Sequence, residues 1–133
     1  MITLVDRASR CFLGYQVVKK RSTDYVQAMI DAVPPAKNYF SDGYSIYWSA
    51  EYGGSRYISL RNKSETYSVE AGNAELRHYL ARLTRKSRCF TRSIAALERA
   101  VKLFVNAWNR RQIHNRAYPN YHADVSDFAC TVN

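Results

Sequence analysis

The residues best suited to chemistry are two acids, Asp42 and Glu70, in a chain with excess positive charge. Asp42 follows a short apolar run, and Glu70 opens an amphipathic segment with Arg77 two helical turns later. Carboxylates are the hard oxygen ligands that magnesium prefers, and a pair of such ions can cleave and rejoin phosphodiesters. On spacing alone two plainer interpretations stay open, a turn at Asp42–Gly43 and a helix-dipole preference at Glu70.

The positive charge is concentrated in one part of the chain. The 133 residues include 20 lysines and arginines against 11 acids, a net charge of +9. Such clustering indicates a nucleic-acid partner, because cations neutralise phosphates and release counterions. The alternative is a solvated basic face; a membrane-surface helix is disfavoured because the apolar residues are needed for a core. Between Arg77 and Arg116 the sequence has the single acid Glu98 and these cationic residues: Arg77, Arg82, Arg85, Lys86, Arg88, Arg92, Arg99, Lys102, Arg110, Arg111 and Arg116.

Composition argues against several other classes of protein. No apolar run approaches the roughly 20 residues of a membrane span, and the N-terminus does not read as a signal peptide, so we expect a cytoplasmic protein with no membrane partner. Three cysteines without a paired motif indicate reduced thiols, and the three histidines show no zinc spacing with them. The length predicts one domain.

The first half of the chain predicts strands with one main helix. Ile2–Val5 and the β-rich run 11–18 predict an antiparallel hairpin. A helix is expected to start at Ser22 or Thr23 and to end at Pro34–Pro35. Strands are expected at 37–41 and 56–60, with a short helix over 44–48 between them. The predicted apolar stripe of the main helix consists of Tyr25, Met29, Ile30 and Val33.

The second half predicts helices. One starts at Ser68, with Leu76, Tyr79, Leu80 and Leu83 on one face. The next spans 93–111, with an apolar face of Ile94, Leu97, Val101, Phe104, Val105 and Trp108. We therefore expect a sheet-rich part (1–67), a helical part (68–114) and an irregular tail (115–133). Interleaved strands and helices indicate an α/β fold.

Four sequence blocks resemble bacterial insertion-sequence transposases, most closely the insertion-sequence-one family. The resemblance covers nearly the whole chain and is most specific from Glu70 to Ser93. It implies a DDE catalytic domain with a ribonuclease-H-like fold, a mixed sheet flanked by helices. The blocks are LVDRASRCFLGYQVVKKR, YFSDGYSIY, KSETYSVEAGNAELRHYLARLTRKSRCFTRS and FVNAWNRRQ.

The resemblance assigns roles to several residues. Asp42 matches the family's second catalytic aspartate and Glu70 its glutamate, so both would bind Mg²⁺, with Mn²⁺ as a substitute. Asn73 and Arg77 match positions that contact DNA. The implied function is DNA transposition by metal-dependent strand cleavage and transfer, with double-stranded transposon ends and target DNA as partners, in a homo-oligomer associated with the nucleoid. The basic stretch that follows adds Arg82, Arg85, Lys86 and Arg88 to the expected DNA contacts.

One departure from the family changes the expectation. The family's first catalytic aspartate lies on a strand that would precede Met1, and Asp6 is interpreted as a structural turn residue. We therefore expect a sheet lacking its first strand and a partial catalytic domain that is incomplete and inactive by itself. The alternative function is a non-catalytic basic DNA-binding protein whose bases stack on Tyr39, Tyr44, Tyr47 and Trp48.

Overall fold

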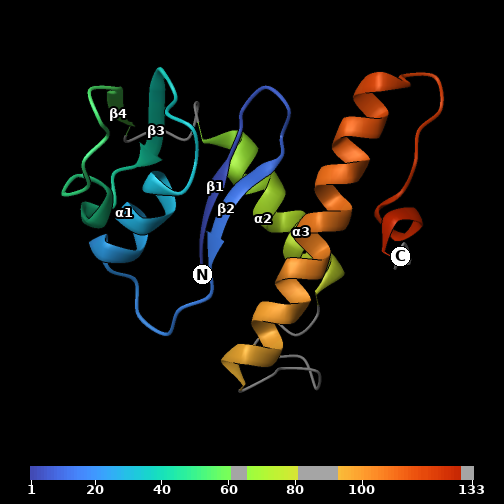
Figure 1. The fold of residues 1–133 in the computed structure, drawn as a ribbon, viewed down its shortest axis with the longest axis horizontal. Coiled ribbons are helices and arrows are strands. Elements are labelled where there is room, and N and C mark those ends of the chain that lie inside the picture. Colours follow the sequence, from blue (N-terminus) through green and yellow to red (C-terminus); the bar gives the residue numbers. More distant parts are fainter. Residues whose placement is uncertain (61–65, 81–92, 130–133) are drawn as a thin grey trace.

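The computed structural model describes residues 1–60, 66–80 and 93–129. In these residues two small sheets and three α-helices alternate along the chain (Figure 1), which confirms the α/β class. The elements are β1 (Ile2–Val5), β2 (Phe12–Gln16), α1 (Thr23–Asp31), β3 (Asn38–Asp42), the 3₁₀ turn η1 (Ser45–Tyr47), β4 (Arg56–Leu60), α2 (Tyr67–Tyr79), α3 (Ile94–Ala117) and the 3₁₀ turn η3 (Val125–Phe128).

The predicted hairpin at the N-terminus is confirmed. β1 pairs antiparallel with β2. In the connecting loop the Asp6 N–H donates to the Cys11 carbonyl, and the Arg10 N–H donates to the Asp6 carbonyl. The Asp6 carboxylate accepts hydrogen bonds from the backbone N–H (2.7 Å) and the hydroxyl of Ser9. These bonds lower the pKa of Asp6, the Ser9 hydroxyl contributing most. Asp6 therefore has the structural turn role expected of it.

A β-bulge turns Phe12 and Gly14 of β2 toward different cores. Val5 pairs with Phe12 and Leu4 with Gly14, so the pairing slips by one residue between them. Phe12 packs beside α2, where a side chain on Gly72 would approach its ring to 3.0 Å. Gly14 faces α1, and a side chain there would meet Met29 at 2.6 Å. One short strand thus contributes to both cores, because a bulge reverses the alternation of side chains.

The second sheet is parallel. β3 pairs with β4 in register from Asn38 opposite Arg56 to Asp42 opposite Leu60. The connection contains η1 and turns at Gly53 and Gly54, which both have positive φ. The predicted strand and short helix are confirmed, with the difference that Asp42 is the last residue of the strand rather than the turn after it.

The helices follow the predicted spacing with local differences. In α1, Val26, Met29 and Ile30 are buried, but Tyr25 is 44% exposed, so its place in the predicted stripe was wrong. α3 is capped by the Ser93 hydroxyl and continues to Ala117. In α2, Leu76 is fully buried, whereas Tyr79 is 45% exposed and lies against Phe104. Leu83, which we expected on the same face of α2, lies outside the described residues. Among the described residues, no helix is long and apolar enough to cross a membrane.

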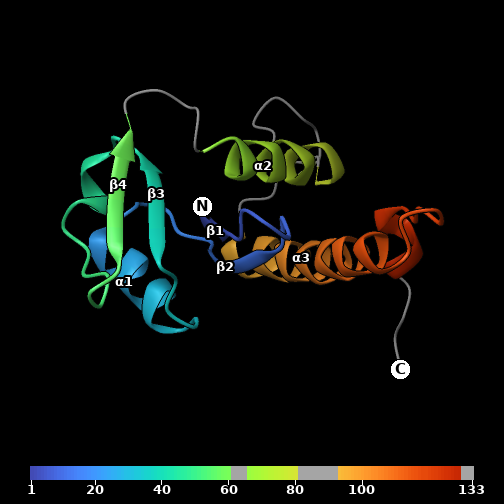
Figure 2. The ribbon, with the colours of Figure 1, turned by 90° about the horizontal axis from the view of Figure 1, so that it is seen from above.

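The fold has two hydrophobic cores on opposite sides of the strands. One lies under α1 and joins Ile2 to Tyr39. The other joins Phe12 to Leu76 of α2 and to the buried face of α3. Figures 1 and 2 show β3–β4 and β1–β2 side by side, with β1 and β3 as the inner strands. The strands that we expected in one mixed sheet therefore form two separate pairs.

Candidate functional site

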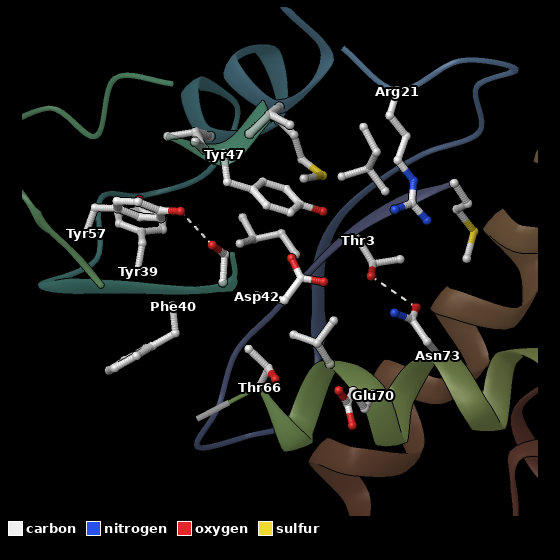
Figure 3. A pocket seen from close by; sticks show the side chains of 18 of the residues that line it. Thr3, Arg21, Tyr39, Phe40, Asp42, Tyr47, Tyr57, Thr66, Glu70 and Asn73 are labelled. Carbon is white, nitrogen blue, oxygen red and sulfur yellow. Dashed lines mark hydrogen bonds between the residues drawn. The ribbon is translucent and has the colours of Figure 1, made fainter. Parts of the chain in front are cut away.

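A cavity of about 240 Å³ lies between β1 and β3, under the first turns of α2. Asp42, from the end of β3, and Glu70, from α2, both line it (Figure 3). Two residues 28 positions apart in sequence therefore line the same cavity. The hypothesis that the two carboxylates act together requires this arrangement.

Alternation along β3 aims Asp42 toward α2. Tyr39 is 8% exposed and belongs to the core under α1. Successive side chains of a strand point to opposite faces, so Phe40 and Asp42 lie on the other face. Tyr47 lies nearby: burial raises the pKa of its hydroxyl, and the Asp42 charge raises it further. The Tyr47 hydroxyl therefore stays protonated at neutral pH, beside the carboxylate.

The α2 side of the cavity carries three polar residues on one helical face. Asn73 lies about one turn after Glu70, and Arg77 about two turns after Glu70, so the three residues form a row along one face of α2. All three line the cavity. Asp42 and Glu70 are both solvent-exposed, so ions and larger ligands can reach both carboxylates.

Asn73 is held by a strand residue. The Thr3 hydroxyl donates a 3.0 Å hydrogen bond to the Asn73 amide oxygen (Figure 3). Since the oxygen is engaged, the amide N–H₂ is the group that Asn73 presents as a donor.

Positive groups gather at one end of the cavity. Arg21, Arg77 and the N-terminus of Met1 line it together. Burial lowers the pKa of the Met1 amino group, and the charges of Arg21 and Arg77 lower it further. This end of the cavity favours an anionic ligand.

The predicted site residues are distributed as follows. Asp42, Glu70, Asn73 and Arg77 come together, whereas Asp6 does not line this cavity. Among the aromatics weighed as stacking groups, Tyr39 is buried, while Tyr44 and Trp48 are 47% and 60% exposed. Four predicted DNA contacts lie outside the described residues: Arg82, Arg85, Lys86 and Arg88.

Sequence reasoning missed Thr3 and Arg21 as cavity residues. Thr3 carried a usable signal, because it is the polar member of an otherwise apolar strand and alternation places it opposite Ile2 and Leu4. Arg21 carried none, since it is one of three consecutive cations.

The donor set suits a hard divalent cation. In the described part of the chain, no three His, Cys, Asp or Glu side chains gather closely enough to form a metal cluster. Magnesium, however, is commonly held by one or two carboxylates, with waters and substrate phosphates as the other ligands. Asp42 and Glu70 fit that pattern.

Comparison with known proteins gives one match. A family model described as IS1 transposase matches residues 5–111, which include Arg21, Asp42, Glu70, Asn73 and Arg77 but not Met1 or Thr3. No curated protein and no solved structure matches the chain.

Proposed function

The chain belongs to the IS1 transposase family, and we propose that it carries two of the carboxylates of a DDE-type site for DNA strand cleavage and transfer. The observation that carries this proposal is the shared cavity of Asp42 and Glu70. Family membership makes transposition the general function. The roles of individual residues belong to the proposal.

Asp42 and Glu70 would hold Mg²⁺, or Mn²⁺ in its place. When bound, such an ion lowers the pKa of a coordinated water or hydroxyl and stabilises charge on phosphate oxygens. The protein's own contribution is positional: β3 and α2 hold the two carboxylates on either side of an open cavity.

Double-stranded DNA is the proposed substrate. Arg77 lies exposed on the same helical face as Glu70, where its guanidinium suits a phosphate. Asn73 presents its amide N–H₂ from the same row. The basic residues 82–88 extend this surface in the proposal, and the full transposase acts as a homo-oligomer on two transposon ends.

A ribonuclease-H-like fold is the architecture we infer. An antiparallel hairpin followed by a helix and a parallel strand pair agrees with that order of elements. In this proposal the described residues supply two of the three acids of a DDE site, so the chain alone does not catalyse strand transfer.

DNA binding and cleavage test the two parts of the proposal. Arg77→Ala should weaken binding to a labelled duplex and reduce the slope of log affinity against log salt by about one. Arg56→Ala, on the far strand β4, is the matched control and should change neither. Binding insensitive to salt would contradict the phosphate contacts.

The cleavage arm uses the purified chain with supercoiled plasmid DNA and Mg²⁺ or Mn²⁺. No nicking or joining is expected. Clear activity that disappears in Asp6→Ala would overturn the assignment of Asp6 to a structural role and the proposed inactivity of the chain.

A further inference from the structure

Two large aromatic side chains are exposed shortly after Asp42 in the sequence. Tyr44 immediately precedes the 3₁₀ turn η1, and Trp48, which is 60% exposed, immediately follows it. Exposure alone is common for single apolar residues on a protein surface. Here the two rings are also held in place by the fold, and both lie next to the proposed catalytic cavity.

The indole of Trp48 is tied to the second sheet. Its N–H donates a 3.1 Å hydrogen bond to the Ser59 hydroxyl on β4. In the parallel strand pair Ser59 lies opposite Ser41, the residue before Asp42. A side chain on Gly43, the residue after Asp42, would come to 3.9 Å from the same hydroxyl. Trp48 is thus held near the C-terminal ends of β3 and β4, close to Asp42, while much of its ring stays open to solvent.

Tyr44 is held from the side of the cavity. Its backbone N–H donates to the Asp42 carbonyl, and its ring lies edge-on to the ring of Tyr47, with centroids 6.2 Å apart. Tyr47 lines the cavity that Asp42 and Glu70 share. The Arg21 guanidinium lines the same cavity and lies over the Tyr44 ring, 6.0 Å from its centroid. A continuous set of contacts therefore leads from the cavity to the exposed Tyr44 ring.

The chemistry of this surface matches a nucleotide. A nucleobase stacks on an aromatic side chain through its flat face, and such stacking is tolerant of sequence. Inside a duplex the neighbouring base pairs cover both faces of each base, so the partner must be an unpaired or terminal base. Arg21 places a guanidinium beside the Tyr44 ring, and guanidinium groups suit phosphate. A nucleotide would engage both the rings and the cation, whereas a purely apolar ligand would engage only the rings.

We propose that Trp48 stacks an unpaired nucleobase of DNA, with Tyr44 as the second ring and Arg21 at the phosphate of that nucleotide. This role rests on the proposed function, because cleavage of a strand leaves a terminal base with one uncovered face beside the reacting phosphate. Stacking on Trp48 would hold that strand end next to Asp42. Trp48 and Tyr44 position the DNA and take no part in breaking or forming bonds.

Duplexes with an unpaired end test this role directly. The probe is a duplex with a short single-stranded 3′ end that carries 2-aminopurine, whose fluorescence falls when the base stacks. One control keeps the phosphates of the single-stranded end but lacks its bases, and another is the blunt duplex. A dye at the far end of each duplex gives affinity by fluorescence polarisation. All measurements are made in EDTA, so that no strand is cut.

The chain should bind the duplex with unpaired bases about tenfold more tightly than the one whose end lacks bases, and it should quench the 2-aminopurine. Trp48→Ala should lose the quenching and most of that preference, and Trp48→Phe, which keeps a ring, should retain part of both. Because Trp48 is exposed, these variants leave the cores intact. Tyr121→Ala, whose ring is 75% exposed in the segment after α3, is the matched control and should behave like the parent chain.

Equal affinity for the ends with and without bases would overturn the role of Trp48, while salt-dependent binding of the blunt duplex would leave the proposed function standing. Absence of binding to every duplex would overturn both. Equal losses in Trp48→Ala and Tyr121→Ala would also overturn this role. Iodide quenching, taken as the difference between the parent chain and Trp48→Phe, reports whether Trp48 is open in the DNA-free protein, because the other tryptophan, Trp108, is buried. A Trp48 shielded from iodide would assign the surface to contact with a second copy and would overturn the role as well.

Discussion

The Thr3 hydroxyl on β1 bonds the Asn73 amide on α2 at 3.0 Å, across 70 positions of sequence. The bond holds the face of α2 that carries Glu70 and Arg77 next to β1 of the hairpin. Strand and helix are thereby joined by two residues that both line the cavity.

Thr3→Val should destabilise the fold by about 1 kcal/mol, because the variant keeps the side-chain shape but leaves the Asn73 oxygen without its donor. Urea denaturation measures the difference. Thr3→Ser retains the hydroxyl and is the control. No loss in Thr3→Val together with a clear loss in Thr3→Ser would show that packing of the methyl group, not the hydrogen bond, is responsible.

Asn109→Ala should lower the free energy of unfolding by more, about 2 kcal/mol or above, because both the N–H and the carbonyl of Phe12 lose their partner. The same denaturation experiment applies. Asn106→Ala, exposed on the same helix, is the matched variant and should be nearly neutral. A similar small loss in both would contradict the role of Asn109 as a cap of the strand edge.

Asp6 gives a prediction in pH. Because its pKa is lowered in the folded chain by the bonds from Ser9, its carboxylate stabilises the fold above the unfolded pKa of about 3.9. That contribution is lost as pH falls through the lower folded value. The stability gap between the parent chain and Asp6→Ala should therefore be full at pH 7 and shrink below about pH 4.

Ser9→Ala checks the cause. It removes the main donor, so NMR titration should show the Asp6 pKa moving up toward its ordinary range. A stability gap that is constant with pH, or an unmoved Asp6 pKa in Ser9→Ala, would contradict this account.

Local patterns predicted the elements well and their assembly less well. The strands at Ile2–Val5 and Arg56–Leu60 and the buried face of α3 follow from alternation and helical spacing. Tyr25 was misplaced because the choice between two adjacent apolar residues, Tyr25 and Val26, depends on where α1 meets the sheet. Spacing alone does not contain that information.

The site shows the same division. Asp42 and Glu70 were identified from residue type and from resemblance, and the structure brings them to one cavity. The contribution of Thr3 depends on β1 lying beside α2, a long-range contact. The bond from Asn109 to Phe12 likewise joins segments 97 positions apart, and no local pattern indicates it.

Binding of Mn²⁺, followed by electron paramagnetic resonance, tests most directly whether Asp42 and Glu70 act together. Asp42→Asn and Glu70→Gln should each weaken binding at least about tenfold, since even supporting contacts around a metal are worth 10–100-fold. Glu75→Gln, on α2 but outside the cavity, should bind like the parent chain. Unchanged binding in either site variant, or equal loss in Glu75→Gln, would contradict a shared metal site.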